Sequence, residues 1–282
     1  MSKIKRPTIA LIYDFDGTLS PGNMQEYGFI PSTGLSSEEF WRKSREMTES
    51  QDASEILCYM RLMIEEGKHK RISLKRESFR KYGKEVELFN GVTEWFDLIN
   101  EYGKKKGVKI EHYINSSGLK EIIEGTPIAK HFKRIYACSF YYSSDDVAEW
   151  PAVAVDFTAK TQFLFMINKG IESIKDNKKI NDFKPDSERP VPFKQMIYFG
   201  DGATDIPCMK LVKQNGGFSI AVYTPKDRTK KKSAEKLISE GRVNFVCPAD
   251  FSENREIHNI VMRVIDKIQA DNLVNHLARK VL

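Results

Sequence analysis

Short apolar runs alternate with amphipathic stretches along most of this chain. The runs have the length of buried strands, whereas the stretches between them carry apolar residues three and four positions apart, as on one face of a helix. Strands that alternate with helices predict an α/β fold with a Rossmann-like, open, mostly parallel sheet and helices on both faces. The predicted strands cover residues 8–15, 108–114, 133–140, 152–157, 196–199 and 217–223.

The stretch from 20 to 88 has a helical pattern instead. Ser36 and Glu39 form a capping-box pattern, in which each side chain bonds the backbone of the other residue, and a helix is predicted to follow. Asp52 and Glu55 predict the start of a second helix, and a third follows it. This stretch therefore predicts a helical module that interrupts the sheet domain.

The domain organisation follows from this interruption. We predict a core domain of residues 1–19 and 89–282, and a helical cap domain of residues 20–88. The polar stretch 170–195 contains three prolines and predicts a long excursion on the surface.

Composition narrows the class of protein. Of 282 residues, 40% are hydrophobic and 30% are charged, which is typical of an ordered globular protein. No apolar run approaches the roughly 18 residues of a membrane-spanning helix, and the apolar run after the first residues is too short for a signal peptide. Four scattered cysteines without a C-x-x-C pair favour a reducing compartment. We therefore expect a cytoplasmic protein with no membrane partner.

The formal net charge of +6 suits an anionic ligand. Nucleic acid is not the expected partner, because aromatic residues do not interleave with the basic ones. The basic run from Lys226 to Lys232 is interpreted as a solvated helix face.

Carboxylates follow two of the predicted strands, where parallel sheets bind their ligands. Asp14 and Asp16 come directly after the first strand, and Gly17 permits a tight turn behind them. Asp201 and Asp205 follow the strand at 196–199 between glycines. Carboxylate oxygens without histidine or cysteine nearby favour Mg²⁺.

Two further positions carry polar groups in the same context. Ser116 or Ser117, with Gly118, is predicted at a helix start, where a hydroxyl and free N–H groups bind anions; a simple helix cap is the alternative. Lys160 is predicted in the first turn of a helix, where a cation is unfavourable unless an anion lies nearby; a surface lysine is the alternative.

In chain order these segments resemble the motifs of the haloacid dehalogenase superfamily, in particular its phosphoserine-phosphatase-like branch. D-F-D-G-T-L at Asp14 is similar to the first motif, and the strand that ends at Ser116 is similar to the second. Lys160 corresponds to the third motif, and G-D-G-A-T-D around Asp201 to the fourth. The resemblance covers about residues 10–225.

The resemblance implies a Mg²⁺-dependent phosphatase of a small phosphorylated metabolite. Asp14 would be the nucleophile that becomes an aspartyl-phosphate, Asp16 the general acid and base, and Lys160 a catalytic cation. The implied metal ligands are Asp14, the Asp16 carbonyl, Asp201 and Asp205, and the implied phosphate ligands are Gly17, Thr18, Ser116, Ser117, Gly118 and Lys160.

Within the superfamily, Asp16 favours a phosphatase, because dehalogenases lack this second aspartate. The acidic residue that phosphoserine phosphatases carry after the first motif comes later here, at Glu26, so phosphoserine is not predicted. The alternatives are a phosphotransferase or mutase that uses the same aspartyl-phosphate, and a nucleic-acid-binding or end-processing protein.

Overall fold

The computed structural model describes residues 6–278, and its strands form a seven-stranded sheet in the order β4-β3-β2-β1-β5-β6-β7. All neighbouring strands are parallel except β3 and β4, which form an antiparallel hairpin. The predicted open, mostly parallel α/β sheet is therefore confirmed. Its strands are β1 (Thr8–Tyr13), β2 (Lys109–Leu119), β3 (Phe132–Tyr142), β4 (Ala148–Val153), β5 (Met196–Gly200), β6 (Phe218–Tyr223) and β7 (Phe245–Pro248).

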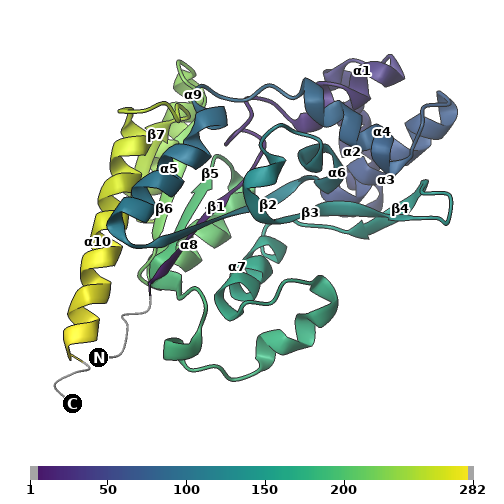
Figure 1. Ribbon diagram of the computed structural model, residues 1–282. Coiled ribbons are helices and arrows are strands. Elements are labelled where there is room, and N and C mark those ends of the chain that lie inside the picture. The colour runs from purple at the N-terminus through teal and green to yellow at the C-terminus, as the bar shows by residue number, and fades with distance from the viewer. Residues whose placement is uncertain (1–5, 279–282) are drawn as a thin grey trace.

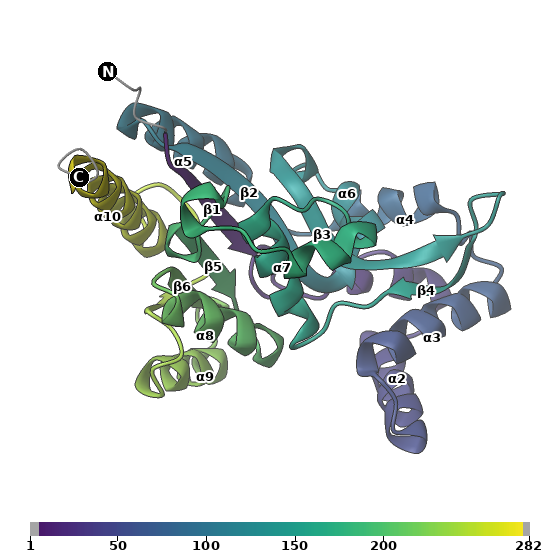
Figure 2. The same ribbon diagram turned by 90° about the horizontal axis from the view of Figure 1, so that it is seen from below.

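Helices cover both faces of this sheet (Figures 1 and 2). One face carries α5 (Val92–Lys106) and α10 (Glu256–Ala278), and the other carries α7 (Ala159–Lys169) and α8 (Ile206–Gln214). Beside α8 lies α9 (Arg228–Ser239), which packs on β6 and β7, and α6 (Lys120–Glu124) lies against β3. None of the helices within 6–278 is long and apolar enough to cross a membrane.

Four helices lie between β1 and α5 in the chain and gather at one end of the molecule (Figure 1). The antiparallel β3–β4 hairpin extends toward them, and α3 packs on β4. The inserted helical segment is thus present, while its boundaries as a separate cap domain stay a prediction. The four helices are α1 (Phe29–Thr33), α2 (Ser37–Gln51), α3 (Glu55–His69) and α4 (Arg76–Tyr82).

The helix starts in this segment differ in one place from those expected. The capping box of Ser36 and Glu39 is present at the start of α2. Asp52, expected to begin the next helix, instead ends α2 in the left-handed conformation, with φ of 47°. Ser54 caps α3, and its hydroxyl accepts from the Leu57 N–H at 3.4 Å. Either polar residue can cap a helix, and only the backbone conformation distinguishes them.

Two predicted strands also need correction. The strand expected at 152–157 is instead Ala148–Val153, and it runs antiparallel to β3 rather than parallel. The strand expected at 108–114 continues to Leu119. The stretch 170–195 contains three short 3₁₀ helices but no α-helix or strand, which agrees with the predicted excursion. β7 was not predicted, because its four residues make too short a pattern.

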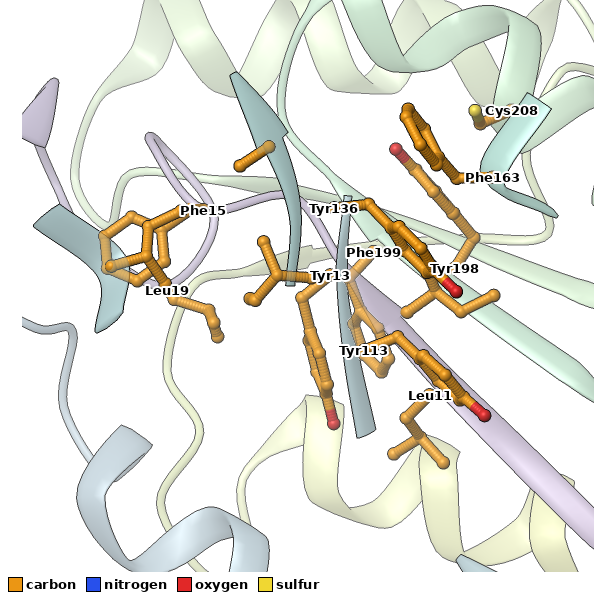
Figure 3. Close-up of a cluster of buried hydrophobic side chains, with 14 of the residues drawn as sticks. Leu11, Tyr13, Phe15, Leu19, Tyr113, Tyr136, Phe163, Tyr198, Phe199 and Cys208 are labelled. Carbon is orange, nitrogen blue, oxygen red and sulfur yellow. The ribbon is translucent and has the colours of Figure 1, made fainter. Parts of the chain in front are cut away.

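The central strand β1 is buried almost throughout, because helices cover the sheet on both sides. Tyr13 of β1 stacks on Phe199 of β5, with ring centroids 4.7 Å apart. Tyr198 precedes Phe199 in β5, and successive residues of a strand face opposite ways. Tyr198 therefore points to the other side of the sheet from Tyr13 (Figure 3). The Tyr13 hydroxyl accepts from the Trp95 indole N–H at 2.8 Å, so α5 is fastened to β1.

His112 of β2 completes this buried polar cluster. Its Nδ1 lies 3.1 Å from the Tyr13 hydroxyl, and its Nε2 lies 3.2 Å from Oδ1 of Asn100. Burial, with a smaller contribution from His131, lowers the pKa of His112 to about 3. The folded chain therefore holds a neutral imidazole at pH values where the unfolded chain would protonate it.

Replacing His112 by Asn is expected to make the protein less sensitive to acid. In the wild type the unfolded chain takes up a proton below about pH 6.5, so stability falls as the pH drops. Between pH 7 and 5 the free energy of unfolding should fall by about 2 kcal/mol more in the wild type than in the variant. Urea unfolding at the two pH values measures this difference. Replacing the exposed His69 by Asn is the control, and an equal loss in His112→Asn and wild type would contradict the assignment.

Candidate active site

Two neighbouring strands bring the predicted carboxylates together. β1 and β5 are paired in parallel, and the Asp14 N–H donates to the Phe199 carbonyl at 2.9 Å, so the segments after both strands leave the sheet side by side. Asp14, Asp201 and Asp205 each present a carboxylate oxygen, and these oxygens all lie within 4.8 Å of one another. Asp14 and Asp205 are 191 positions apart in the sequence, yet the fold brings their carboxylates together.

Lys160 of α7 offsets part of the negative charge of this cluster. Its Nζ donates to Oδ1 of Asp14 at 3.0 Å and to Oδ1 of Asp205 at 2.7 Å, and its side chain is fully buried. The side chain of Asn115, on β2, donates to the Lys160 carbonyl at 3.0 Å, which fastens the first turn of α7 to the sheet. The alternative of a surface lysine is therefore excluded.

Burial and mutual repulsion dominate the electrostatics. Burial, and then the charge of Asp205, raises the pKa of Asp14 to about 7 although Lys160 opposes the change. The pKa of Asp16 lies well above its ordinary value, mainly through burial and the charge of Asp14. Burial and Asp205 also raise the pKa of Asp201. Burial alone would lower the pKa of the Lys160 ammonium, but Asp14 and Asp205 raise it.

Asp16 lies beside this cluster rather than within it. Its Oδ1 accepts from the Met24 N–H at 2.9 Å, and its Oδ2 would lie 3.0 Å from a Cβ placed on Gly118. Its side chain is therefore held between the segment after the first motif and the end of β2. One oxygen is bound by the backbone, and the other faces the predicted phosphate-binding segment.

The predicted phosphate ligands lie around the same place, but their N–H groups are already used. The N–H groups of Gly17, Thr18 and Gly118 donate to the Ser20 carbonyl, the Phe15 carbonyl and the Ser116 hydroxyl, respectively. The expected helix start after Ser116 is also absent, because β2 continues and α6 begins only at Lys120. The second motif is therefore a strand end and not a helix terminus.

Hydroxyl groups remain available where those N–H groups are not. Within residues 6–278, Oγ1 of Thr18 and Oγ of Ser117 are buried without a hydrogen-bond partner. The Ser116 oxygen accepts from Gly118, which leaves its own proton to donate. These hydroxyls therefore have hydrogen bonds to offer a ligand that reaches them.

The donor set suits a divalent ion with a preference for oxygen. Three carboxylates lie close enough together to bind a single ion. In the described chain no histidine or cysteine belongs to this group. Mg²⁺ binds such carboxylates, often with waters completing its shell. The residues therefore fit the ion that the sequence implies.

Gly17 leaves room for this arrangement. It has φ of +75°, and a Cβ at this position would lie 2.2 Å from Oδ2 of Asp201. A side chain here would both strain the backbone and push the Asp201 carboxylate out of the cluster.

Replacing Gly17 by Ala is expected to weaken divalent-ion binding roughly tenfold and to lower the free energy of unfolding by about 1–2 kcal/mol. Calorimetric titration with Mg²⁺ and urea unfolding measure the two effects. Gly34→Ala is the matched control, because Gly34 also has positive φ, of +78°, but a Cβ there meets nothing within 4 Å. The control should lose stability alone. Equal Mg²⁺ affinity in both variants would show that the Asp201 contact has no role in binding.

The structure adds residues that the sequence pattern did not single out. The Tyr198 hydroxyl donates to Oδ1 of Asp205 at 2.7 Å, and Oγ1 of Thr204 lies 3.4 Å from the Lys160 Nζ. Lys230 belongs to the run interpreted as a solvated helix face, yet its Nζ donates to Oδ2 of Asp201 at 3.1 Å. The tyrosine in a predicted buried strand was the one usable signal, since a buried hydroxyl requires a partner.

One curated relative is similar over nearly the whole chain. It is an uncharacterized protein from Borreliella burgdorferi, 31% identical over an alignment of 286 positions, gaps included, that covers 91% of this chain and 96% of the relative. The chain belongs to the same family as this protein. No family model matches the chain.

Solved structures identify the fold of this chain. A substrate-bound phosphoserine phosphatase has a TM-score of 0.55 at 16% identity, with 91% of this chain and 98% of that chain covered. A predicted phosphatase from Clostridium acetobutylicum has a TM-score of 0.50 at 15% identity, with 91% and 99% covered. This chain thus has the fold of these phosphatases, the haloacid dehalogenase fold that the sequence predicted.

Proposed function

We propose that this chain is a Mg²⁺-dependent phosphatase that hydrolyses a small phosphorylated metabolite in the cytoplasm through a phosphorylated Asp14. The convergence of Asp14, Asp201 and Asp205 around the buried Lys160 carries the proposal. A fold needs no such concentration of buried charge for stability, because buried ion pairs contribute little once desolvation is counted. A charged cluster at the carboxyl ends of parallel strands is instead typical of a site for ligands.

The divalent ion would be held by Asp14, Asp201 and the carbonyl of Asp16, with Asp205 in support. When bound, it supplies positive charge that offsets the repulsion between an anionic nucleophile and an anionic phosphate. Asp205 is engaged by both Lys160 and Tyr198 through its Oδ1, so its role is to orient its neighbours as much as to bind the ion.

In the first step a carboxylate oxygen of Asp14 attacks phosphorus, and the bond from phosphorus to the substrate oxygen breaks. Asp16 donates a proton to that departing oxygen and becomes a carboxylate. Its position supports this role, since the Met24 N–H holds one of its oxygens and the other faces Gly118. An aspartyl-phosphate and a free alcohol result.

In the second step water attacks the phosphorus of the aspartyl-phosphate. Asp16 takes the proton from this water, and the bond from phosphorus to the Asp14 oxygen breaks. Inorganic phosphate leaves, and both aspartates return to their first states. One difficult displacement is thereby divided into two easier ones.

The phosphate oxygens require donors during both steps. The Lys160 ammonium supplies charge, and the hydroxyls of Thr18, Ser116 and Ser117 supply hydrogen bonds. Two of these hydroxyls are buried without a partner in the described chain, whereas the N–H groups of Gly17, Thr18 and Gly118 donate elsewhere. We therefore assign the hydrogen bonds to phosphate to the hydroxyls before the backbone, while Lys160, whose Nζ already bonds Asp14 and Asp205, contributes its positive charge.

The helical segment contributes the surface that selects the substrate. The Tyr59 hydroxyl of α3 donates to the Ser117 carbonyl at 2.8 Å, so α3 contacts the phosphate-binding segment directly. Glu26 accepts from the Trp41 indole N–H at 2.6 Å and from Asn23. Both bonds go to Oε1 and fix the Glu26 carboxylate beside Asn23 and Trp41.

A screen of phosphorylated metabolites and p-nitrophenyl phosphate tests the proposal. Release of inorganic phosphate in the presence of Mg²⁺, and its loss in EDTA, are the expected results. Transfer to an added acceptor without free phosphate would favour a phosphotransferase instead. Lack of turnover across the panel, in protein that binds Mg²⁺, would count against phosphatase activity.

A further inference from the structure

Each of the three clustered carboxylates has an ammonium partner in the protein. Lys160 contacts Asp14 and Asp205, and Lys230 contacts Asp201. The two lysines differ in their surroundings. The Lys160 side chain is 0% exposed, whereas that of Lys230 is 51% exposed and reaches the cluster from α9.

The helix α9, which carries Lys230, is capped and packed on the core, although the Lys230 side chain is half-exposed. The Asp227 side chain accepts from the N–H groups of Thr229 and Lys230 at 2.9 and 3.0 Å, which caps α9. Ala234 and Leu237 of the same helix are buried in the core. The backbone of Lys230 therefore has a fixed position, and its ammonium reaches Asp201 through a flexible chain of four carbons.

Lys230 and a divalent ion would place positive charge on the same carboxylate. Asp201 is the most exposed of the three, with its side chain 13% exposed, and Lys230 lies on its solvent side. A half-exposed ammonium can return to water at small cost, whereas the buried Lys160 has no such path.

We propose that Lys230 is an internal cation that competes with the divalent ion for the Asp201 carboxylate and leaves it when the ion binds. The inference rests on the proposed function only in taking Asp201 as a ligand of that ion. Lys230 thus sets the affinity for the ion without touching the reacting atoms, and it keeps the carboxylate neutralised when the ion is absent.

Calorimetric titration of the full chain with Mg²⁺ tests the proposal. Lys230→Met removes the competing charge but keeps most of the stem, and it is expected to tighten Mg²⁺ binding about fivefold. Lys230→Arg should weaken binding, because a guanidinium holds a carboxylate through two parallel hydrogen bonds. Lys232→Met is the matched control, an exposed lysine of the same helix whose loss should leave the affinity within about twofold.

Amine acetylation followed by mass spectrometry gives a readout independent of affinity. Reactivity of Lys230 should rise several-fold when Mg²⁺ is added, and that of Lys232 should not. Equal Mg²⁺ affinity in wild type and Lys230→Met, or equal tightening in Lys232→Met, would overturn competition and leave the phosphatase proposal intact. If the wild type and all variants, Asp201→Asn included, fail alike to bind Mg²⁺, the metal site itself is wrong and both proposals fail.

Discussion

Replacement of Asp14 by Asn abolishes turnover, by a factor on the order of 10⁴ or more, if Asp14 is the nucleophile. An amide retains the shape of the side chain but cannot attack phosphorus as a carboxylate does. The remaining donors, among them Lys160, would still bind phosphate. Rates of phosphate release from the best substrate of the panel measure the loss, and substrate titration shows whether binding survives.

Asp156→Asn is the matched control for this variant. Asp156 is a partly buried aspartate three residues before α7, and its carbonyl accepts from the Lys160 N–H at 2.9 Å. Its side chain lies outside the carboxylate cluster, so activity should stay within about a factor of two. Thermal unfolding of both variants shows that the folds are retained. More than about 1% of wild-type turnover in Asp14→Asn would contradict nucleophilic attack by Asp14.

Replacement of Lys160 by Met is expected to lower the free energy of unfolding by about 3 kcal/mol at pH 8 in the absence of divalent ions. Methionine fills much of the buried volume, but Asp14 and Asp205 lose the ammonium that lies 3.0 and 2.7 Å from them. Two buried carboxylates then face each other without a counter-charge. Urea unfolding monitored by circular dichroism measures the change.

The loss in Lys160→Met should depend on pH with a defined sign. Asp14 has its pKa raised to about 7 even beside Lys160, and removing the ammonium raises it further. At pH 5 Asp14 is protonated with or without the ammonium, whereas at pH 8 the wild type holds a paired carboxylate that the variant must leave unpaired or protonate, so the variant loses more stability at the higher pH. Added Mg²⁺ should restore part of the loss at pH 8.

Lys210→Met is the control, since Lys210 is an exposed lysine of the neighbouring helix α8. It should lose less than about 0.5 kcal/mol at either pH. If Lys160→Met were as stable as this control at pH 8, the ammonium would have no part in holding the carboxylates together. A loss of the same size at pH 5 and pH 8 would place the cost in packing rather than in charge.

Local patterns predicted those parts of the fold that depend on neighbouring residues. The capping box of Ser36 and Glu39 was correct, because both partners lie within one helical turn. Asp52 was wrong, because Ser54 offers an equivalent cap and the left-handed backbone of Asp52 has no signature in sequence. The end of β2 was placed too early, since pairing of Leu119 with Cys138 of β3 extends the strand through polar residues.

The candidate site likewise has residues that the sequence predicted and contacts that only the structure shows. The sequence indicated Asp14, Asp16, Asp201 and Asp205, which come directly after apolar strands, and the structure brings three of them together. The role of backbone N–H groups in phosphate binding could not be judged from sequence, because only the folded loops show that these groups bond Ser20, Phe15 and Ser116.

By itself, then, the sequence determined the alternation of strands and helices, the inserted helical segment and the aspartates at the strand ends. The tertiary structure alone decided that Lys160 is buried between two carboxylates, that Tyr198 donates to Asp205 and that Lys230 reaches Asp201. Hydrophobic periodicity reports which side of an element is buried, and it does so within a few turns of chain. A charge pair between residues distant in sequence has no period, so only the packing of α7 and α9 against the sheet reveals it.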